Sequence, residues 1–211
     1  MAKLKIANPQ IVTCVGGPHS TYAHEPTIRK KGIDYLCRGE GDVAILEFVE
    51  YIAALHAGSP GLMPQGRYCQ DDDGKIVGFG NGILAADMNQ LPFPDKSDAF
   101  AKIPGNRDIY TIASGRGCYN GCTFCNSPTV RKNYREEGFS YMRRRAVDDI
   151  ILELKMAKER YRPKAIWFVD DTFIFNKKYM RKFAEKYGAE IGLPFFCNTI
   201  PDFFDEEILA D

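Results

Sequence analysis

Three cysteines lie within eight residues of one another near the middle of the chain. Residues 114–125 read SGRGCYNGCTFC, which spaces Cys118, Cys122 and Cys125 as C-x3-C-x2-C. Thiolates at such short spacing are ligands of iron–sulfur clusters and of zinc. A four-iron cluster takes four ligands, so three cysteines leave one iron open, and open positions are typical of reactive metal sites. The loop also contains glycines that let the backbone bend closely around a cluster: Gly115, Gly117 and Gly121.

A structural zinc site is the alternative for these three cysteines. It would need a distant fourth ligand, such as a histidine or Cys197. Zinc sites commonly use two C-x2-C pairs, and the sequence has no second pair. The spacing therefore favours an iron–sulfur cluster.

The other cysteines are scattered through apolar runs, which is typical of small buried side chains. The chain has seven cysteines, an odd number, and its start lacks the apolar stretch of a secretion signal. We expect free thiols rather than a disulfide framework, and a cytoplasmic location. The scattered residues are Cys14, Cys37, Cys69 and Cys197.

The elements that must position the cysteine loop alternate in type along the chain. Residues 11–15 and 33–37 are predicted strands, and apolar residues at helical spacing predict a helix over 43–55 that Asp42 caps. A short helix is expected over 27–31. This succession is typical of a doubly wound α/β sheet.

The second half begins again with a strand, over residues 108–113, directly before the cysteine loop. Further strands are predicted over 165–169 and 193–197. Helices are predicted over 147–161, 177–187 and from 205 onward. Strands that alternate with helices, without hairpins, predict a parallel sheet or part of a barrel.

Between the two halves, residues 67–79 read as a β-hairpin that turns at Asp-Gly, and residues 91–95 form a proline-rich linker. We therefore expect one domain over residues 1–60, a hairpin and linker over 61–107, and a second domain over 108–211.

The cysteine loop resembles the signature of the radical S-adenosylmethionine (radical SAM) enzymes, both in spacing and in the aromatic residue before the last cysteine. Residues 167–173, WFVDDTF, resemble the second barrel strand of the cobalamin-dependent branch of that family, F-x-D-D-x-F. Residues 141–145 resemble the run before its first helix, and residues 197–202 resemble its third strand.

Upstream, residues 16–19 and 38–41 resemble the C-terminal half of the cobalamin-binding domain in this branch. The resemblance thus implies an α/β fold: the C-terminal half of a Rossmann-like cobalamin-binding domain, followed by the first three β/α units of a partial TIM barrel. A full barrel takes about 250 residues, so we expect the chain to be an internal piece of a longer enzyme.

The resemblance also implies the cofactors. Cys118, Cys122 and Cys125 would hold a [4Fe-4S] cluster, and S-adenosylmethionine would bind its open iron and be cleaved reductively to a 5′-deoxyadenosyl radical. An electron donor such as flavodoxin or ferredoxin would supply the electron. The expected contacts of S-adenosylmethionine are Phe124, Val169, Asp170, Asp171 and Asn198, and those of cobalamin are Gly16, Gly17, Gly39, Glu40 and Gly41.

Several of these residues have structural alternatives. Asp170 and Asp171 would equally serve as a helix N-cap, and Glu40 would equally cap the helix that follows it. The arginines over 143–145 would either bind an anion or lie solvated at the start of a helix. The cobalt-ligand motif D-x-H-x-x-G is absent, and neither His19 nor His24 replaces it in spacing.

Composition limits the partners. Lys plus Arg and Asp plus Glu each number 28, so the formal net charge is zero and the sequence has no nucleic-acid signature. The most apolar stretch, residues 44–55, contains two glutamates, so no membrane span is expected.

The leading hypothesis is a cobalamin-using radical SAM enzyme that methylates or rearranges an unknown substrate. The alternatives are a cobalamin-free enzyme similar to the methylthiotransferases and a non-catalytic module that binds an iron–sulfur cluster or cobalamin.

Overall fold

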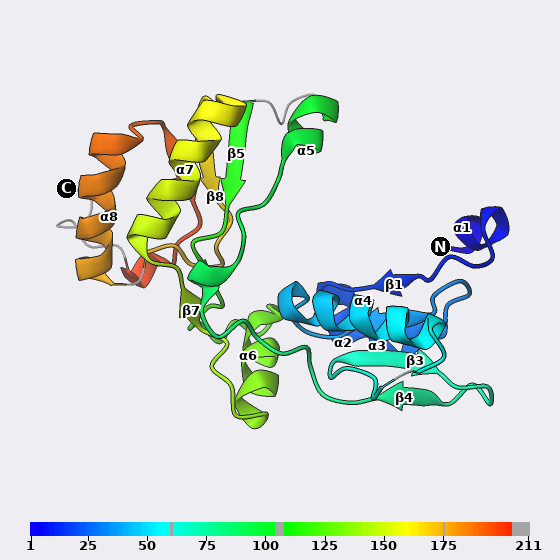
Figure 1. The fold of residues 1–211 in the computed structure, drawn as a ribbon. Coiled ribbons are helices and arrows are strands. Elements are labelled where there is room, and N and C mark those ends of the chain that lie inside the picture. Colours follow the sequence, from blue (N-terminus) through cyan, green and yellow to red (C-terminus); the bar gives the residue numbers. More distant parts are fainter. Residues whose placement is uncertain (60, 104–107, 175, 204–211) are drawn as a thin grey trace. The chain divides into compact units, whose positions relative to one another are not determined.

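The computed structural model describes all residues except 60, 104–107, 175 and 204–211. The chain divides into two compact units (Figure 1). Unit 1 comprises residues 1–86 and 132–139, and unit 2 comprises 87–131 and 140–211. No helix among the described residues is long and apolar enough to cross a membrane.

Unit 1 is built on a four-stranded sheet with the order β1-β2-β3-β4. The first two strands are parallel, and the hairpin predicted at residues 67–79 adds two antiparallel strands beside β2. The hairpin therefore extends the sheet of the preceding residues instead of standing apart with the linker. The strands are β1 (Cys14–Val15), β2 (Tyr35–Cys37), β3 (Arg67–Gln70) and β4 (Ile76–Gly78).

The helices of unit 1 differ in two details from the sequence prediction. The short helix expected over residues 27–31 lies earlier in the chain. Pro18 is the first residue of one short helix, as is common for proline, and a second short helix follows it and ends at Ile28. Asp42 does not cap the long helix: Gly41 is the N-cap, and Asp42 is the first helical residue, where its charge favours the helix N-terminus. The helices are α1 (Ala2–Ala7), α2 (Pro18–Tyr22), α3 (His24–Ile28) and α4 (Asp42–His56).

The core of unit 1 is small, with Ile28, Leu36 and Tyr68 at its centre. Beside it lies a fully buried arginine, Arg67. Its guanidinium donates to the Cys37 sulfur at 2.5 Å and to the Ala44 carbonyl. Arg67 therefore joins strand β2 to helix α4.

Unit 2 contains a sheet of three parallel strands, in the order β5-β8-β9. The prediction of a parallel sheet is confirmed, and each strand lies within its predicted range. The strands are β5 (Ile109–Ile112), β8 (Ala165–Phe168) and β9 (Phe195–Cys197).

Two long helices cover one face of this sheet, α7 (Val147–Tyr161) and α8 (Lys177–Glu190) (Figure 1). Their apolar residues form one core with the sheet, including Ile150 and Leu154 of α7, Phe183 of α8 and Phe168 of β8. This packing fixes the ends of the strands, where the residues of interest lie. The helix expected from residue 205 onward lies outside the described residues.

Shorter elements complete unit 2. A small antiparallel pair follows strand β5, formed by β6 (Gly115–Arg116) and β7 (Arg143–Arg144). Before β5 come η1 (Met88–Gln90) and α5 (Ser97–Lys102), and after β9 comes η3 (Pro201–Phe203).

Helix α6 (Ser127–Glu136) begins two residues after the last cysteine of the loop. No helix was predicted here from the sequence, because few apolar residues recur in this stretch. The helix is divided between the units, since residues 132–139 belong to unit 1.

Candidate functional site

The cysteine loop leaves the sheet at the carboxyl end of β5. Two residues separate β5 from β6, and the pairing of β6 with β7 fixes the start of the loop. Gly117 follows with a φ of +89°, and a Cβ at this position would lie 2.6 Å from the Met142 sulfur. Only glycine fits this left-handed conformation and close approach.

The three cysteines are free thiols, with Cys118 and Cys122 half-buried and Cys125 exposed. Backbone N–H groups approach two of the sulfurs, from Asn120 to Cys118 at 3.4 Å and from Ser127 to Cys125 at 3.5 Å. Both N–H groups thus hold the loop backbone close to the sulfur atoms.

No group of three or more histidine, cysteine or acidic side chains within the described part of the chain converges on one point where a single metal ion would sit. In a four-iron cluster, by contrast, each thiolate binds a different iron, so the sulfurs need not converge. The donor set of three accessible thiols, with backbone N–H groups directed at two of them, fits such a cluster.

Side chains after strand β8 contact the cysteine loop. The Thr172 hydroxyl lies 3.2 Å from the Cys118 sulfur, and the Ser127 hydroxyl at the start of α6 donates to the Asp171 carboxylate at 2.9 Å. From α6, the Arg131 guanidinium donates to the carbonyl of Cys118. The carboxyl ends of β5 and β8 therefore meet at the loop, as expected for neighbouring parallel strands.

Asp170 is buried, with 2% of its surface exposed. It accepts hydrogen bonds from the backbone N–H of Ser114 at 3.0 Å and from the Ser114 hydroxyl at 2.7 Å, and it forms an ion pair with Arg144 at 3.5 Å. Burial raises the pKa of Asp170, while these donors lower it, and burial lowers the pKa of Arg144. Asp170 thus fixes the exit of β5 into the cysteine loop.

The other expected contacts of S-adenosylmethionine differ in accessibility. Phe124 is 92% exposed and Val169 is 41% exposed. Asp171 is exposed as well. The Asn198 amide donates to the carbonyl of Asp170 at 3.2 Å, so it ties β9 to the end of β8.

Neither Asp170 nor Asp171 caps helix α8. That role belongs to Asn176, whose side chain accepts from the N–H of Tyr179. The N-cap interpretation of the two aspartates is therefore wrong, because five residues separate Asp171 from the first helical residue, Lys177.

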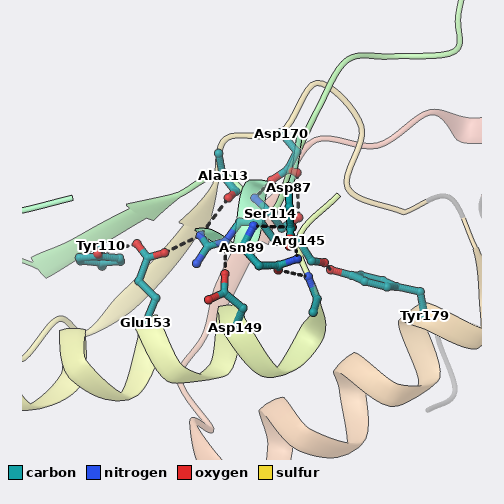
Figure 2. A network of polar contacts seen from close by, with 11 residues as sticks. Asp87, Asn89, Tyr110, Ala113, Ser114, Arg145, Asp149, Glu153, Asp170 and Tyr179 are labelled. Atoms are coloured by element: carbon teal, nitrogen blue, oxygen red, sulfur yellow. Dashed lines mark hydrogen bonds and ion pairs between the residues drawn. The ribbon is translucent and has the colours of Figure 1, made fainter. Parts of the chain in front are cut away.

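The arginines over residues 143–145 are not a solvated run. Figure 2 shows the Arg145 side chain between Asp149 and Glu153 of α7, near the carbonyl of Ala113. The Tyr110 hydroxyl of β5 donates to Glu153 at 2.8 Å. This buried network joins α7 to the carboxyl end of β5, so the arginines at 144 and 145 position the site instead of binding a free anion.

The glycine loops of unit 1 were expected to contact cobalamin. They differ in how much open space lies beside the glycine backbone. A Cβ at Gly17 or Gly41 would meet nothing within 4 Å, whereas one at Gly16 would be in ordinary contact with Cys37. These backbones are open to a ligand. Gly39 is different, because a Cβ there would lie 2.2 Å from the Tyr134 hydroxyl.

Glu40 is nearly buried, and its N–H donates to the same Tyr134 hydroxyl at 2.7 Å. The N-cap position of α4 belongs to Gly41 and not to Glu40. The loop at residues 39–40 is therefore packed against residues 132–139 of its own unit, and only part of the expected cobalamin contact is open.

Residues 112–211 match the radical SAM superfamily. The chain carries a radical SAM domain. This match begins at the last residue of β5 and includes the cysteine loop, β8 and β9, whereas the glycine loops of unit 1 lie outside it.

Three curated relatives extend the likeness to the first half of the chain. An uncharacterized methyltransferase of Pyrococcus horikoshii is 30% identical over 82% of the chain. Cytidylyl-2-hydroxyethylphosphonate methyltransferase of Streptomyces wedmorensis is 24% identical over 98% of it. Anaerobic magnesium-protoporphyrin IX monomethyl ester cyclase of Rubrivivax gelatinosus is 25% identical over 97% of it.

The chain spans 36%, 43% and 37% of the lengths of these three relatives, in the same order. It therefore corresponds to less than half of each. The superfamily is one of enzymes, and the names of two of these relatives are those of methyltransferases.

The sequence pointed to the cysteines, the aspartates and an arginine run that includes Arg144, but not to Ser127, Arg131 or Thr172 as contacts of the cysteine loop. A signal was present for Thr172, because it lies inside the D-D-x-F motif. The others gave none, since their roles depend on contacts between distant segments.

Proposed function

We propose that Cys118, Cys122 and Cys125 hold a [4Fe-4S] cluster beside which S-adenosylmethionine binds, in an enzyme that transfers a methyl group with the help of cobalamin. The cluster would supply one-electron reductive cleavage of S-adenosylmethionine, and cobalamin would supply methyl transfer. The radical SAM match of residues 112–211 supports the first part of the proposal.

The single observation that carries the proposal is the meeting of the three-thiol loop with the end of strand β8. Thr172 contacts Cys118, and Asp171 accepts from Ser127 directly after the loop. A cofactor bound at the loop would thus face groups from two parallel strands, at the strand ends where such barrels carry their functional groups.

The chain's residues divide between binding and positioning in this proposal. The backbone at Phe124 and the exposed Val169 and Asp171 would contact S-adenosylmethionine. Asp170 and Asn198 would act indirectly, because both side chains are engaged with the protein itself. They would hold the ends of β5, β8 and β9 in register around the ligand.

Cobalamin would lie over the open backbone at Gly16, Gly17 and Gly41 in unit 1. Residues 39 and 40 would hold the backbone of that loop in place and would not contact the ligand. The proposed Rossmann-like character of this unit rests on the parallel pair β1–β2 and the helices that follow each strand.

Methyl transfer is the reaction we favour, because two of the three relatives are named methyltransferases. The third is named a cyclase, so ring formation is the second candidate reaction. In either case a one-electron donor of the flavodoxin or ferredoxin class is required. The seven free cysteines favour a reducing compartment, which would be the cytoplasm.

The test is anaerobic reconstitution of the chain with iron and sulfide, followed by iron analysis and electron paramagnetic resonance (EPR) after reduction. We expect about four iron atoms per chain and an EPR signal that changes when S-adenosylmethionine is added. The variant Cys122→Ala should lose the cluster, while Cys69→Ala, at a half-buried cysteine of unit 1, should keep it.

Zinc without iron in the reconstituted chain would refute the proposal. A cluster whose signal ignores S-adenosylmethionine would instead favour the non-catalytic module. Retention of hydroxocobalamin after gel filtration, followed by its visible absorbance, distinguishes the cobalamin-using enzyme from a cobalamin-free relative.

A further inference from the structure

One buried hydroxyl at the site has no part in the proposed contacts of S-adenosylmethionine. Thr172 follows the two aspartates after β8, and only 1% of its surface is exposed. Its hydroxyl lies 3.2 Å from the sulfur of Cys118, the first cysteine of the loop. A buried hydroxyl at this distance is placed to form a hydrogen bond with the sulfur of a metal-binding cysteine.

The position of this hydroxyl is fixed from several sides. The Arg144 guanidinium donates to the carbonyl of Thr172, and Arg144 is itself held by Asp170. The next residue, Phe173, is fully buried in the core, and its N–H donates to the carbonyl of Asn198 at 2.9 Å. The backbone of Thr172 is therefore anchored to β7 and to the end of β9.

The direction of the hydrogen bond follows from the chemistry of the sulfur. A cysteine that binds iron is a thiolate and carries no proton, so it can only accept. The Thr172 hydroxyl must then donate. A donor to a cluster sulfur stabilises the more negative, reduced state more than the oxidised state, and hydrogen bonds to sulfur are among the factors that set cluster potentials.

We propose that Thr172 is a positioning residue that donates a hydrogen bond to the cluster-bound thiolate of Cys118 and thereby raises the reduction potential of the cluster. The inference rests on the proposed function, because it needs the cluster to be present. In the reduction itself one electron passes from the external donor to the cluster, and the hydroxyl proton stays on Thr172. The hydrogen bond would make the cluster easier to reduce by a ferredoxin or flavodoxin.

The test compares the reconstituted chain with Thr172→Val and Thr172→Ser in anaerobic redox titrations, with the EPR signal of the reduced cluster as the readout. Valine has nearly the shape of threonine but cannot donate, whereas serine keeps the hydroxyl. We expect Thr172→Val to shift the reduction equilibrium about tenfold toward the oxidised cluster, or about 59 mV lower in potential. Thr172→Ser should stay close to the unaltered chain.

The matched control is Thr27→Val in unit 1. Thr27 is also buried, and its hydroxyl has no hydrogen-bond partner among the described residues. The same threonine-to-valine change should therefore leave the potential unchanged.

The possible failures are distinguishable. If the unaltered chain binds no cluster, the proposed function fails and this inference fails with it. If the cluster forms but Thr172→Val has the potential of the unaltered chain, only the inference fails. If Thr172→Val retains no iron while Thr172→Ser does, Thr172 is needed for assembly, and its role in setting the potential is overturned.

Discussion

Asp170 and Asp171 are neighbours in sequence, but their carboxylates have different surroundings. Asp170 is buried against Ser114 and Arg144, while Asp171 lies at the surface and accepts from Ser127. Because a buried carboxylate with charged and backbone donors is costly to alter, the first aspartate stabilises the fold of the site. The second is exposed and makes its hydrogen bond at the surface.

Substitutions of these two aspartates should therefore differ in their effect on the stability of the chain. We expect Asp170→Asn to lower the free energy of unfolding of the cofactor-free chain by about 2 to 3 kcal/mol, since the amide cannot accept from every donor around it. Asp171→Asn should cost less than about 0.5 kcal/mol. Urea titration followed by the fluorescence of Trp167, the only tryptophan of the chain and part of β8, measures both. Equal losses would contradict this assignment.

The elements of unit 2 are tied to one another by charges as well as by their core. Asp148 in the first turn of α7 contacts two lysines of α8, Lys182 at 2.8 Å and Lys186. These hydrogen bonds lower the pKa of Asp148 to about 2, from an ordinary value of 3.8. The two helices that cover the sheet are thus joined at their exposed surface.

The acid dependence of stability should reflect this contact. A carboxyl whose pKa is lowered by folding stabilises the folded state above its ordinary pKa, and this contribution disappears as the pH falls through about 2. Asp148→Asn should therefore be less stable than the unaltered chain at about pH 5, and the difference should vanish near pH 2. Urea midpoints from Trp167 fluorescence at a series of pH values test this.

Asp98→Asn provides the control for that series. Asp98 forms an ion pair with Lys102 at 3.1 Å within the single helix α5. Loss of this ion pair therefore breaks no contact between two elements. A difference between the Asp148 variant and the unaltered chain that persists undiminished down to pH 2 would show that ionisation of Asp148 does not contribute.

At the scale of the molecule, each unit has its own core. The core of unit 2 extends over β5, β8, α7 and α8, whereas the core of unit 1 is much smaller. Since stability increases with buried apolar surface, unit 1 should unfold first. The glycine loop at residue 39 lies in this weaker unit.

Gly39→Ala should show whether unit 1 unfolds before unit 2. The added Cβ would lie 2.2 Å from the Tyr134 hydroxyl at a φ of +81°, so we expect a loss of about 2 kcal/mol or more in unit 1. Far-UV circular dichroism should show a transition moved to lower temperature, while the fluorescence midpoint of Trp167 in unit 2 stays unchanged. Gly41→Ala is the control, because nothing lies within 4 Å of its Cβ. A parallel shift of the Trp167 midpoint would mean that the units unfold together.

The sequence by itself determined which residues supply the three clustered thiols and in which order the elements follow one another. The spacing of three cysteines after a strand indicated an iron–sulfur cluster, and the alternation of strands and helices predicted the parallel sheet of unit 2. These are local patterns, so neighbouring residues suffice to define them. The same locality explains why helix α6 was missed, because its polar sequence lacks an apolar stripe.

Only the tertiary structure decided which polar residues act on one another. Asp170 meets Ser114, 56 positions away, and Thr172 meets Cys118, 54 positions away. The glycine at residue 39 faces a tyrosine hydroxyl rather than open space, whereas the one at residue 41 remains open. Such contacts arise when parallel strands place their ends side by side and when a loop packs against a distant helix. Sequence spacing contains no information on either event, so the division of the site into binding and positioning residues depended on the fold.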